Sequence, residues 1–172
     1  HLAYVFIGII VLIFFSSLSE KGLFKLSILL FFISLFFLIL VPIFGIEVNG
    51  SKRWLNLIIL PRFQPIELVK PFIIIFIASI LCSEKNFNIY IKYLLTVIAI
   101  LPASFLLMIQ PDIGQTLLVF LSWATLVFIS GISLLVILAF LSLFLLSILY
   151  LIFFVPKFFY IKNRILSFFN SN

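Results

Sequence analysis

The chain has 172 residues, of which 66% are hydrophobic and 9% are charged, and its formal net charge at pH 7 is +6. Soluble domains carry about 25% charged residues, so this composition excludes an ordinary soluble protein and predicts one that spans a membrane. The single cysteine, Cys82, excludes an intramolecular disulfide, and the only histidine, His1, excludes a histidine-dependent triad or a zinc site within this chain.

Six apolar segments are each long enough to cross a bilayer. Every backbone polar group must be satisfied internally in lipid, so we expect each segment to be a helix. The chain is therefore predicted to be a single all-α polytopic membrane domain. No basic segment or cleavage site precedes the first span, so we expect a piece of a longer protein rather than a signal peptide. The expected spans are residues 2–18, 26–44, 64–82, 93–109, 112–129 and 134–155.

The fifth and sixth spans differ in polarity. The sixth consists almost entirely of Leu, Ile and Phe, and we expect it to face lipid over much of its surface. The fifth carries polar residues at spacings of three and four, which places them near one face of a helix. That face is expected to look into the protein or a water-filled cavity, and simple packing against other helices is an equal alternative. Its members are Asp112, Gln115, Thr116, Ser122, Trp123 and Ser130.

Two Gln-Pro stretches, at residues 64–67 and 110–112, have the composition of helix starts. Proline and carboxylates are both favoured in the first turn of a helix. Lys70 needs another explanation, because a cation near the N-terminus opposes the helix dipole. Glu67 lies three residues before Lys70, so the two share a helix face and can pair. We expect this pair and Pro71 to mark a kinked helix beside a polar cavity, and a structural clasp between helices is the alternative.

The loop at residues 46–62 contains a cationic patch. Asn49-Gly50 predicts a turn, and Lys52, Arg53 and Trp54 follow it. Arginine matches phosphate oxygens in a bidentate way, so the patch is a candidate phosphate site. The alternative is an ordinary anchor of tryptophan and basic residues at the membrane surface.

Taken together, these stretches resemble the SEDS family of bacterial cell-wall proteins, the FtsW/RodA group. The family's Gly-small-x-Arg-Trp loop corresponds to Gly50–Trp54, its Gln-Pro-x-Glu-x-x-Lys helix start to Gln64–Lys70, and its Gln-Pro-Asp-x-Gly start to Gln110–Gly114. The three motifs occur in the family's order over the whole chain, and they are more similar to the division branch, FtsW. Two positions depart from the pattern: Ile66 replaces a small residue, and Gln115 replaces a common threonine.

The resemblance implies a fragment of a SEDS fold of about ten helices, roughly the second to the seventh. It implies an enzyme of the bacterial cytoplasmic membrane that polymerises lipid II, a sugar-peptide on undecaprenyl pyrophosphate, into glycan strands. The implied partners are a class B penicillin-binding transpeptidase and other division proteins, and nucleic acid is not expected. No cofactor is evident, although a divalent cation at the pyrophosphate would suit such a substrate. The residues implied to bind substrate or line its cavity are Lys52, Arg53, Trp54, Arg62, Gln64, Glu67, Lys70, Gln110 and Asp112.

No catalytic residue is expected within the chain. The resemblance places the family's essential aspartate in a loop beyond Asn172. Transfer to a sugar hydroxyl benefits from a general base, and the carboxylates present are poor candidates. Glu67 is expected to pair with Lys70, and Asp112 lies at a helix start, where the dipole makes it a weak base. Glu47 has no neighbours in the sequence that suggest a held geometry. We therefore expect the chain alone to be inactive; a lipid II flippase or transporter and a non-catalytic division scaffold are the alternatives.

The resemblance also implies an orientation, with loop 46–62 and the tail after Pro156 on the periplasmic side. The positive-inside rule favours the reverse, because the orientation implied by the resemblance places more basic residues outside than inside. We follow the resemblance, because cations outside have a pyrophosphate to bind. The basic residues are Lys52, Arg53, Arg62, Lys157, Lys162 and Arg164 outside, and Lys21, Lys25, Lys85 and Lys92 inside.

Overall fold

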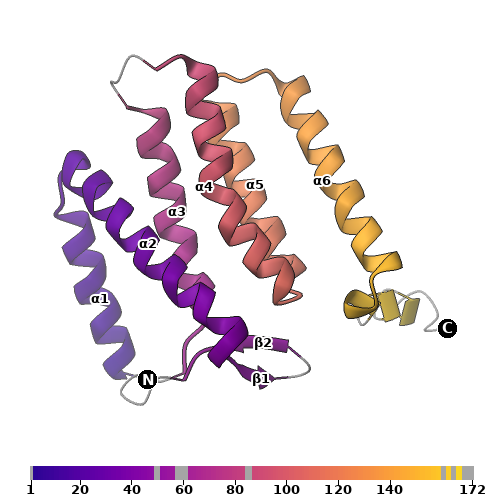
Figure 1. Cartoon of the computed structure of the whole chain (residues 1–172). Coiled ribbons are helices and arrows are strands. Elements are labelled where there is room, and N and C mark those ends of the chain that lie inside the picture. Colours follow the sequence, from indigo (N-terminus) through magenta and orange to yellow (C-terminus); the bar gives the residue numbers. More distant parts are fainter. Residues whose placement is uncertain are drawn as a thin grey trace.

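The computed structural model describes residues 2–48, 51–56, 62–83, 87–159, 162–163 and 166–167. Within these residues the chain forms six α-helices and one β-hairpin, which confirms the expected all-α polytopic architecture (Figure 1). By length and composition, three of the helices, α2, α4 and α6, can each cross a membrane. The elements are α1 (Leu2–Ser16), α2 (Glu20–Phe44), β1 (Ile46–Val48), β2 (Ser51–Trp54), α3 (Pro65–Leu81), α4 (Ile89–Ile109), α5 (Ile113–Ile129), α6 (Leu134–Phe154) and a short 3-10 helix, η1 (Pro156–Phe158).

Two helices begin earlier than the expected spans. Helix α2 begins at Glu20, where the Ser19 hydroxyl accepts a hydrogen bond from a first-turn backbone N–H at 3.3 Å. Helix α4 begins at Ile89, where the Asn88 side chain does the same, also at 3.3 Å. The expected spans covered only the apolar residues, whereas a capped helix extends through the polar residues that flank them.

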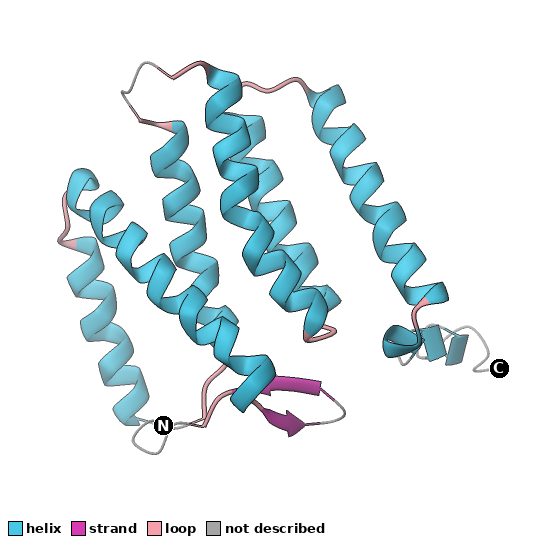
Figure 2. Ribbon diagram, in the orientation of Figure 1, coloured by secondary structure: helices cyan, strands magenta, loops and turns pink. Residues whose placement is uncertain are grey.

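Successive helices run in alternating directions, so their connections gather at two ends of the molecule (Figure 1). The hairpin, the start of α3 and the α4–α5 turn lie at one end. The α1–α2, α3–α4 and α5–α6 connections lie at the other. Figure 2 shows the hairpin beneath the C-terminal end of α2, at the same end as both Gln-Pro stretches.

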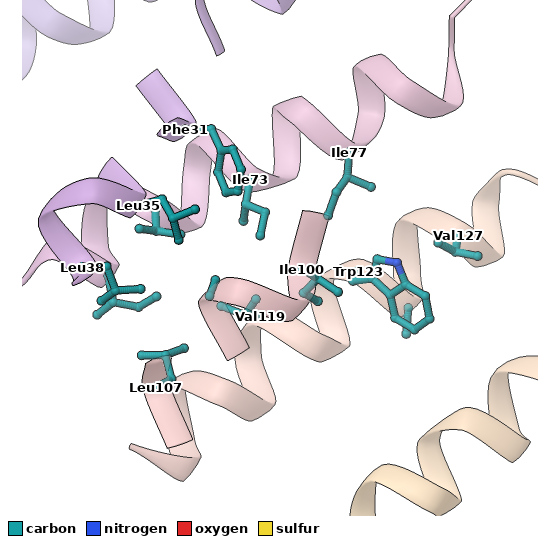
Figure 3. Close-up of a cluster of buried hydrophobic side chains, with 14 of the residues drawn as sticks. Phe31, Leu35, Leu38, Ile73, Ile77, Ile100, Leu107, Val119, Trp123 and Val127 are labelled. Atoms are coloured by element: carbon teal, nitrogen blue, oxygen red, sulfur yellow. The ribbon is translucent and has the colours of Figure 1, made fainter. Parts of the chain in front are cut away.

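The packed core lies between α2, α3, α4 and α5 (Figure 3). No hydrophobic driving force acts between helices in lipid, because lipid tails are as apolar as the side chains. Helices in a membrane therefore associate through close packing of small and shape-matched residues. Ala99 and Ala103 are buried on α4 and let its neighbours approach closely. On α2 the buried Ser34 bonds its own helix through the Phe31 carbonyl at 2.9 Å, so its hydroxyl is satisfied without a partner helix.

The polar face predicted for the fifth span is turned into the protein. Asp112, Thr116 and Trp123 are buried, and the other three members of that face are half-buried. The Trp123 indole N–H donates to the buried Thr96 hydroxyl of α4 at 3.0 Å. Packing between helices therefore accounts for the part of this face around Trp123.

Helix α6 exposes most of its apolar surface, as expected for a span that faces lipid. Its contacts with the core include Phe144, whose ring stacks on Phe120 of α5 with centroids 3.8 Å apart, and Ile137, which is buried in the core cluster. Helix α1 is likewise exposed from Val5 to Phe14.

The segment expected to be a loop at residues 46–62 contains a β-hairpin instead. Strands β1 and β2 pair antiparallel, with Glu47 opposite Lys52 and Val48 opposite Ser51. Asn49 and Gly50, where we predict the turn, lie outside the described residues. Gly45 leads directly from α2 into β1, and a Cβ atom there would collide with the Val41 carbonyl. An Asn-Gly pair between short β-prone stretches is a hairpin signal, and the expectation of a loop did not take it beyond a turn.

Candidate functional site

Both Gln-Pro stretches lie at helix starts, but in different ways. Pro65 is the first residue of α3 and Gln64 its N-cap, without a capping bond from the Gln64 side chain. In the second stretch Gln110 ends α4, and Asp112 caps α5 by accepting the Gln115 N–H at 3.4 Å. Pro111 therefore occupies the corner between two helices rather than the first turn of one.

An ion pair links the hairpin to that corner. Arg53 on β2 places its Nε 3.4 Å from Asp112 Oδ2, and its Nη2 donates to the Pro111 carbonyl at 2.8 Å. The Asp112 side chain is 9% exposed and the Arg53 side chain 29%. Such a pair needs good geometry and further hydrogen bonds to offset its desolvation, and the carbonyl and cap bonds supply them.

A β-bulge at Arg53 makes this contact reachable. Ile46 pairs with Trp54 and Glu47 with Lys52, so the register steps over Arg53. In a regular strand Lys52 and Arg53 would point to opposite faces. An extra residue bends the strand and redirects side chains, so both can face the α4–α5 corner.

A cavity of about 280 Å³ lies between the hairpin and the same corner. Lys52 and Glu47 bring opposite charges to its wall from facing strands, and Gln110 brings an amide. Gln110 is buried and donates to the Leu38 carbonyl of α2 at 3.4 Å, which ties the corner to a third helix. The lining residues are Pro42, Glu47, Ser51, Lys52, Ile109, Gln110 and Pro111.

Glu67 and Lys70 form the predicted pair, with Lys70 Nζ 2.9 Å and 2.8 Å from the two Glu67 carboxylate oxygens. Their side chains are 55% and 25% exposed, and helix α3 continues through Pro71. Gln115 of α5 donates to the same carboxylate at 3.4 Å. The pair therefore lies near the second Gln-Pro stretch, but neither residue is among those that line the cavity.

The remaining candidates take separate places. Trp54 and Arg62 are exposed, and Gln64 is half-buried. The described residues contain no group of three or more His, Cys, Asp or Glu side chains that could hold a metal ion. Sequence reasoning missed three features of the site: the Arg53–Asp112 pair, the cavity position of Glu47, and the contact from Gln115 to Glu67. All three join segments far apart in the chain, and the bulge that enables the first has no signature in residue spacing.

Comparisons with known proteins relate the whole chain to one family. Residues 1–172 match the family model FTSW_RODA_SPOVE, described as "Cell cycle protein". A protein of Aliivibrio salmonicida named "Probable peptidoglycan glycosyltransferase FtsW" is 32% identical over 136 residues, covering 76% of this chain and 33% of that protein. The chain thus spans about a third of the length of this curated relative.

Two solved structures share the fold. The crystal structure of Thermus thermophilus rod shape determining protein RodA matches with a TM-score of 0.65 and 35% identity, covering 77% of this chain and 43% of that one. A chain from a structure on the coordination of polymerization and crosslinking by a peptidoglycan synthase complex matches with a TM-score of 0.73 and 30% identity. That match covers 97% of this chain and 49% of the other.

Proposed function

Because the chain belongs to the FtsW/RodA/SpoVE family of cell cycle proteins, we propose that the full-length protein is a peptidoglycan glycosyltransferase. It would polymerise lipid II into glycan strands during division or cell-shape maintenance. Relatives that carry this enzyme's name support the proposal, and the names of the curated relatives favour the division branch. The observation in the structure that carries it is the charged cavity between the hairpin and the α4–α5 corner.

The chain is a multi-pass membrane protein, and we propose that its membrane is the bacterial cytoplasmic membrane. The cavity lies at one end of the helices, where a lipid-linked substrate would present its polar headgroup. Pockets for whole drug-sized ligands measure roughly 300–1,000 Å³, so a cavity of about 280 Å³ suits one part of lipid II rather than the entire headgroup. The pyrophosphate is the part that Lys52 fits, because an ammonium group binds phosphate as a point charge.

The described carboxylates at this end of the molecule are poor candidates for the general base. Asp112 is engaged by Arg53, and Glu67 by Lys70. Glu47 lines the cavity but faces Lys52 across the hairpin. We propose that the base comes from elsewhere in the full-length protein, and that these 172 residues alone do not polymerise glycan.

A divalent cation at the pyrophosphate is a further part of the proposal. Mg²⁺ is commonly held by one or two carboxylates together with substrate phosphates, and it needs no complete cage of protein ligands. Glu47 is the cavity carboxylate that would hold it, and the cation would neutralise phosphate charge. On this proposal Glu47→Gln in the full-length enzyme raises the Mg²⁺ concentration needed for half-maximal activity. An unchanged Mg²⁺ requirement would remove Glu47 from this role.

The proposed partner is a class B penicillin-binding transpeptidase, along with other division proteins. The similarity to a chain from a peptidoglycan synthase complex that coordinates polymerization and crosslinking supports a crosslinking partner.

The test uses purified full-length protein in lipid vesicles with lipid II and the transpeptidase partner. We expect glycan polymer, and we expect Lys52→Met to raise the KM for lipid II. Lys25→Met is the matched control, because Lys25 is exposed near the other end of α2. Movement of labelled lipid II across the bilayer without polymer would instead support a flippase. The absence of both activities would support a non-catalytic scaffold.

A further inference from the structure

We infer that Arg53 is a positioning residue: it fastens the hairpin to the α4–α5 corner, so that its neighbour Lys52 is held at the cavity wall. The inference rests on the proposed function only for what the cavity binds. It assigns different roles to two adjacent cations, Lys52 and Arg53, that the sequence presents as a single candidate phosphate site.

The contacts of Arg53 are directed at the protein itself. The guanidinium presents donors in a planar fork, and here one donor meets the Pro111 carbonyl at 2.8 Å while Nε lies 3.4 Å from the Asp112 carboxylate. Both acceptors belong to the corner that closes one side of the cavity. A lysine at this position would have a single ammonium and could not reproduce the fork.

Asp112 is fixed from the other side. One carboxylate oxygen accepts the Gln115 N–H at the start of α5, and the other faces Arg53. The Asp112 carbonyl also accepts the Thr116 hydroxyl at 2.8 Å and the Thr116 N–H at 3.0 Å. The anchor for Arg53 is thus a buried carboxylate that the first turn of α5 holds in place.

Lys52 differs from Arg53 in both respects. Its side chain is exposed and lines the cavity with Ser51 and Glu47. The bulge at Arg53 sets the direction of both side chains, because it lies between the Glu47–Lys52 and Ile46–Trp54 pairs. Releasing Arg53 would therefore loosen the hairpin and move Lys52, although Arg53 itself need not touch the ligand.

The first experiment measures whether the hairpin is fastened. Ser51→Cys introduces a nearly isosteric thiol on the cavity wall, in a full-length protein whose other cysteines, Cys82 included, are replaced. Because Ser51 is half-buried, the rate of its reaction with a membrane-impermeant thiol reagent reports how readily that position is reached. We expect Arg53→Gln and Asp112→Asn each to speed labelling by about tenfold, because each weakens the ion pair that fastens the hairpin to the corner.

Two comparisons make this measurement decisive. The double variant should label no faster than the faster single variant, because both changes release the same contact. Lys52→Met should leave the labelling rate unchanged. Asp112→Asn keeps the side-chain shape, so it provides the test even if Arg53→Gln fails to fold. Unchanged labelling in Asp112→Asn, or faster labelling in Lys52→Met, would overturn the inference.

The second experiment separates positioning from substrate contact. With lipid II, Arg53→Lys keeps the charge but loses the fork, so a positioning role predicts that it stays impaired and labels quickly. A phosphate-contacting arginine would also lose activity on replacement by lysine, but labelling would stay as slow as in the parent protein, and slow labelling with lost activity would overturn the inference. Labelling requires no lipid II, so a failure of the proposed function leaves the first experiment intact and can be told apart from it.

Discussion

The two ion pairs at this end of the molecule are built in opposite ways. Glu67 and Lys70 lie within one turn of α3, and more than half of the Glu67 side chain is exposed. Arg53 and Asp112 come from a hairpin and a helix cap far apart in the chain, and Asp112 is almost fully buried. Exposed pairs contribute roughly 0–1 kcal/mol, whereas breaking a buried pair costs about 3–5 kcal/mol. The Glu67–Lys70 pair, which is easier to recognise in the sequence, is therefore expected to contribute less to stability.

Both ion pairs are expected to face the same side of the membrane, and a test of that orientation should give the largest effect. A cysteine at Val48, an exposed residue of β1, should react with a membrane-impermeant reagent from the periplasm in intact cells. A cysteine at Ser133, at the opposite end, should react only after the inner membrane is broken. The reverse pattern would show that the positive-inside rule determines the orientation.

Arg53→Ala should have the largest effect on stability. It leaves the Asp112 carboxylate buried without its cation, and we expect a loss of about 3 kcal/mol, the low end for buried pairs because Arg53 is partly exposed. Thermal unfolding in detergent micelles measures this loss, and polymerisation assays should show weakened use of lipid II. A loss below about 1 kcal/mol would place this pair in the same class as the exposed one.

Trp123→Phe should have an intermediate effect that involves neither pair. It removes the indole N–H that donates to Thr96 in the core, and we expect a loss of about 1 kcal/mol. The KM for lipid II should stay near the parent value, because the bond lies toward the other end of the helices. An altered KM would mean that general destabilisation reaches the cavity, and the effect of Arg53→Ala would then need the same correction.

The smallest effect on stability is expected at the exposed pair. Glu67→Gln and Lys70→Met should each cost about 0.5 kcal/mol, because solvent screens a carboxylate that is 55% exposed. The double variant should cost no more than either single one, since the residues share one interaction. Raising the salt concentration should shrink this difference and leave that of Arg53→Ala nearly unchanged. Strict additivity in the double-mutant cycle would show that the two side chains act independently.

The sequence predicted those parts of the molecule that follow from local pattern. Runs of apolar residues indicated six helices, and the i,i+3 spacing indicated the Glu67–Lys70 pair. Polar residues at helical spacing indicated the inward face of α5. Each of these depends on neighbours within a few residues, which spacing records directly.

The rest depends on which distant segments meet. Nothing in the spacing of Arg53 and Asp112 shows that a bulged strand will reach a helix cap. The stability that the Glu67–Lys70 pair contributes also depends on burial, which residue spacing does not record and the structure shows to be partial. Glu47 lacked a recognisable context for the same reason, because its cavity forms only when the hairpin lies against the α4–α5 corner.

The bulge at Arg53 limits how this region can change in evolution. Side-chain direction in the hairpin depends on residue count as well as residue type, because each strand residue alternates in direction and the bulge interrupts that alternation once. Deleting one residue between positions 51 and 54 would restore a regular register and turn one of the two cations away from the corner. Single substitutions can accumulate there gradually, but a change in length alters the direction of several side chains at once. Insertions and deletions should therefore be rarer than substitutions in this hairpin, even though it lies at an end of the molecule, where length changes are usually tolerated.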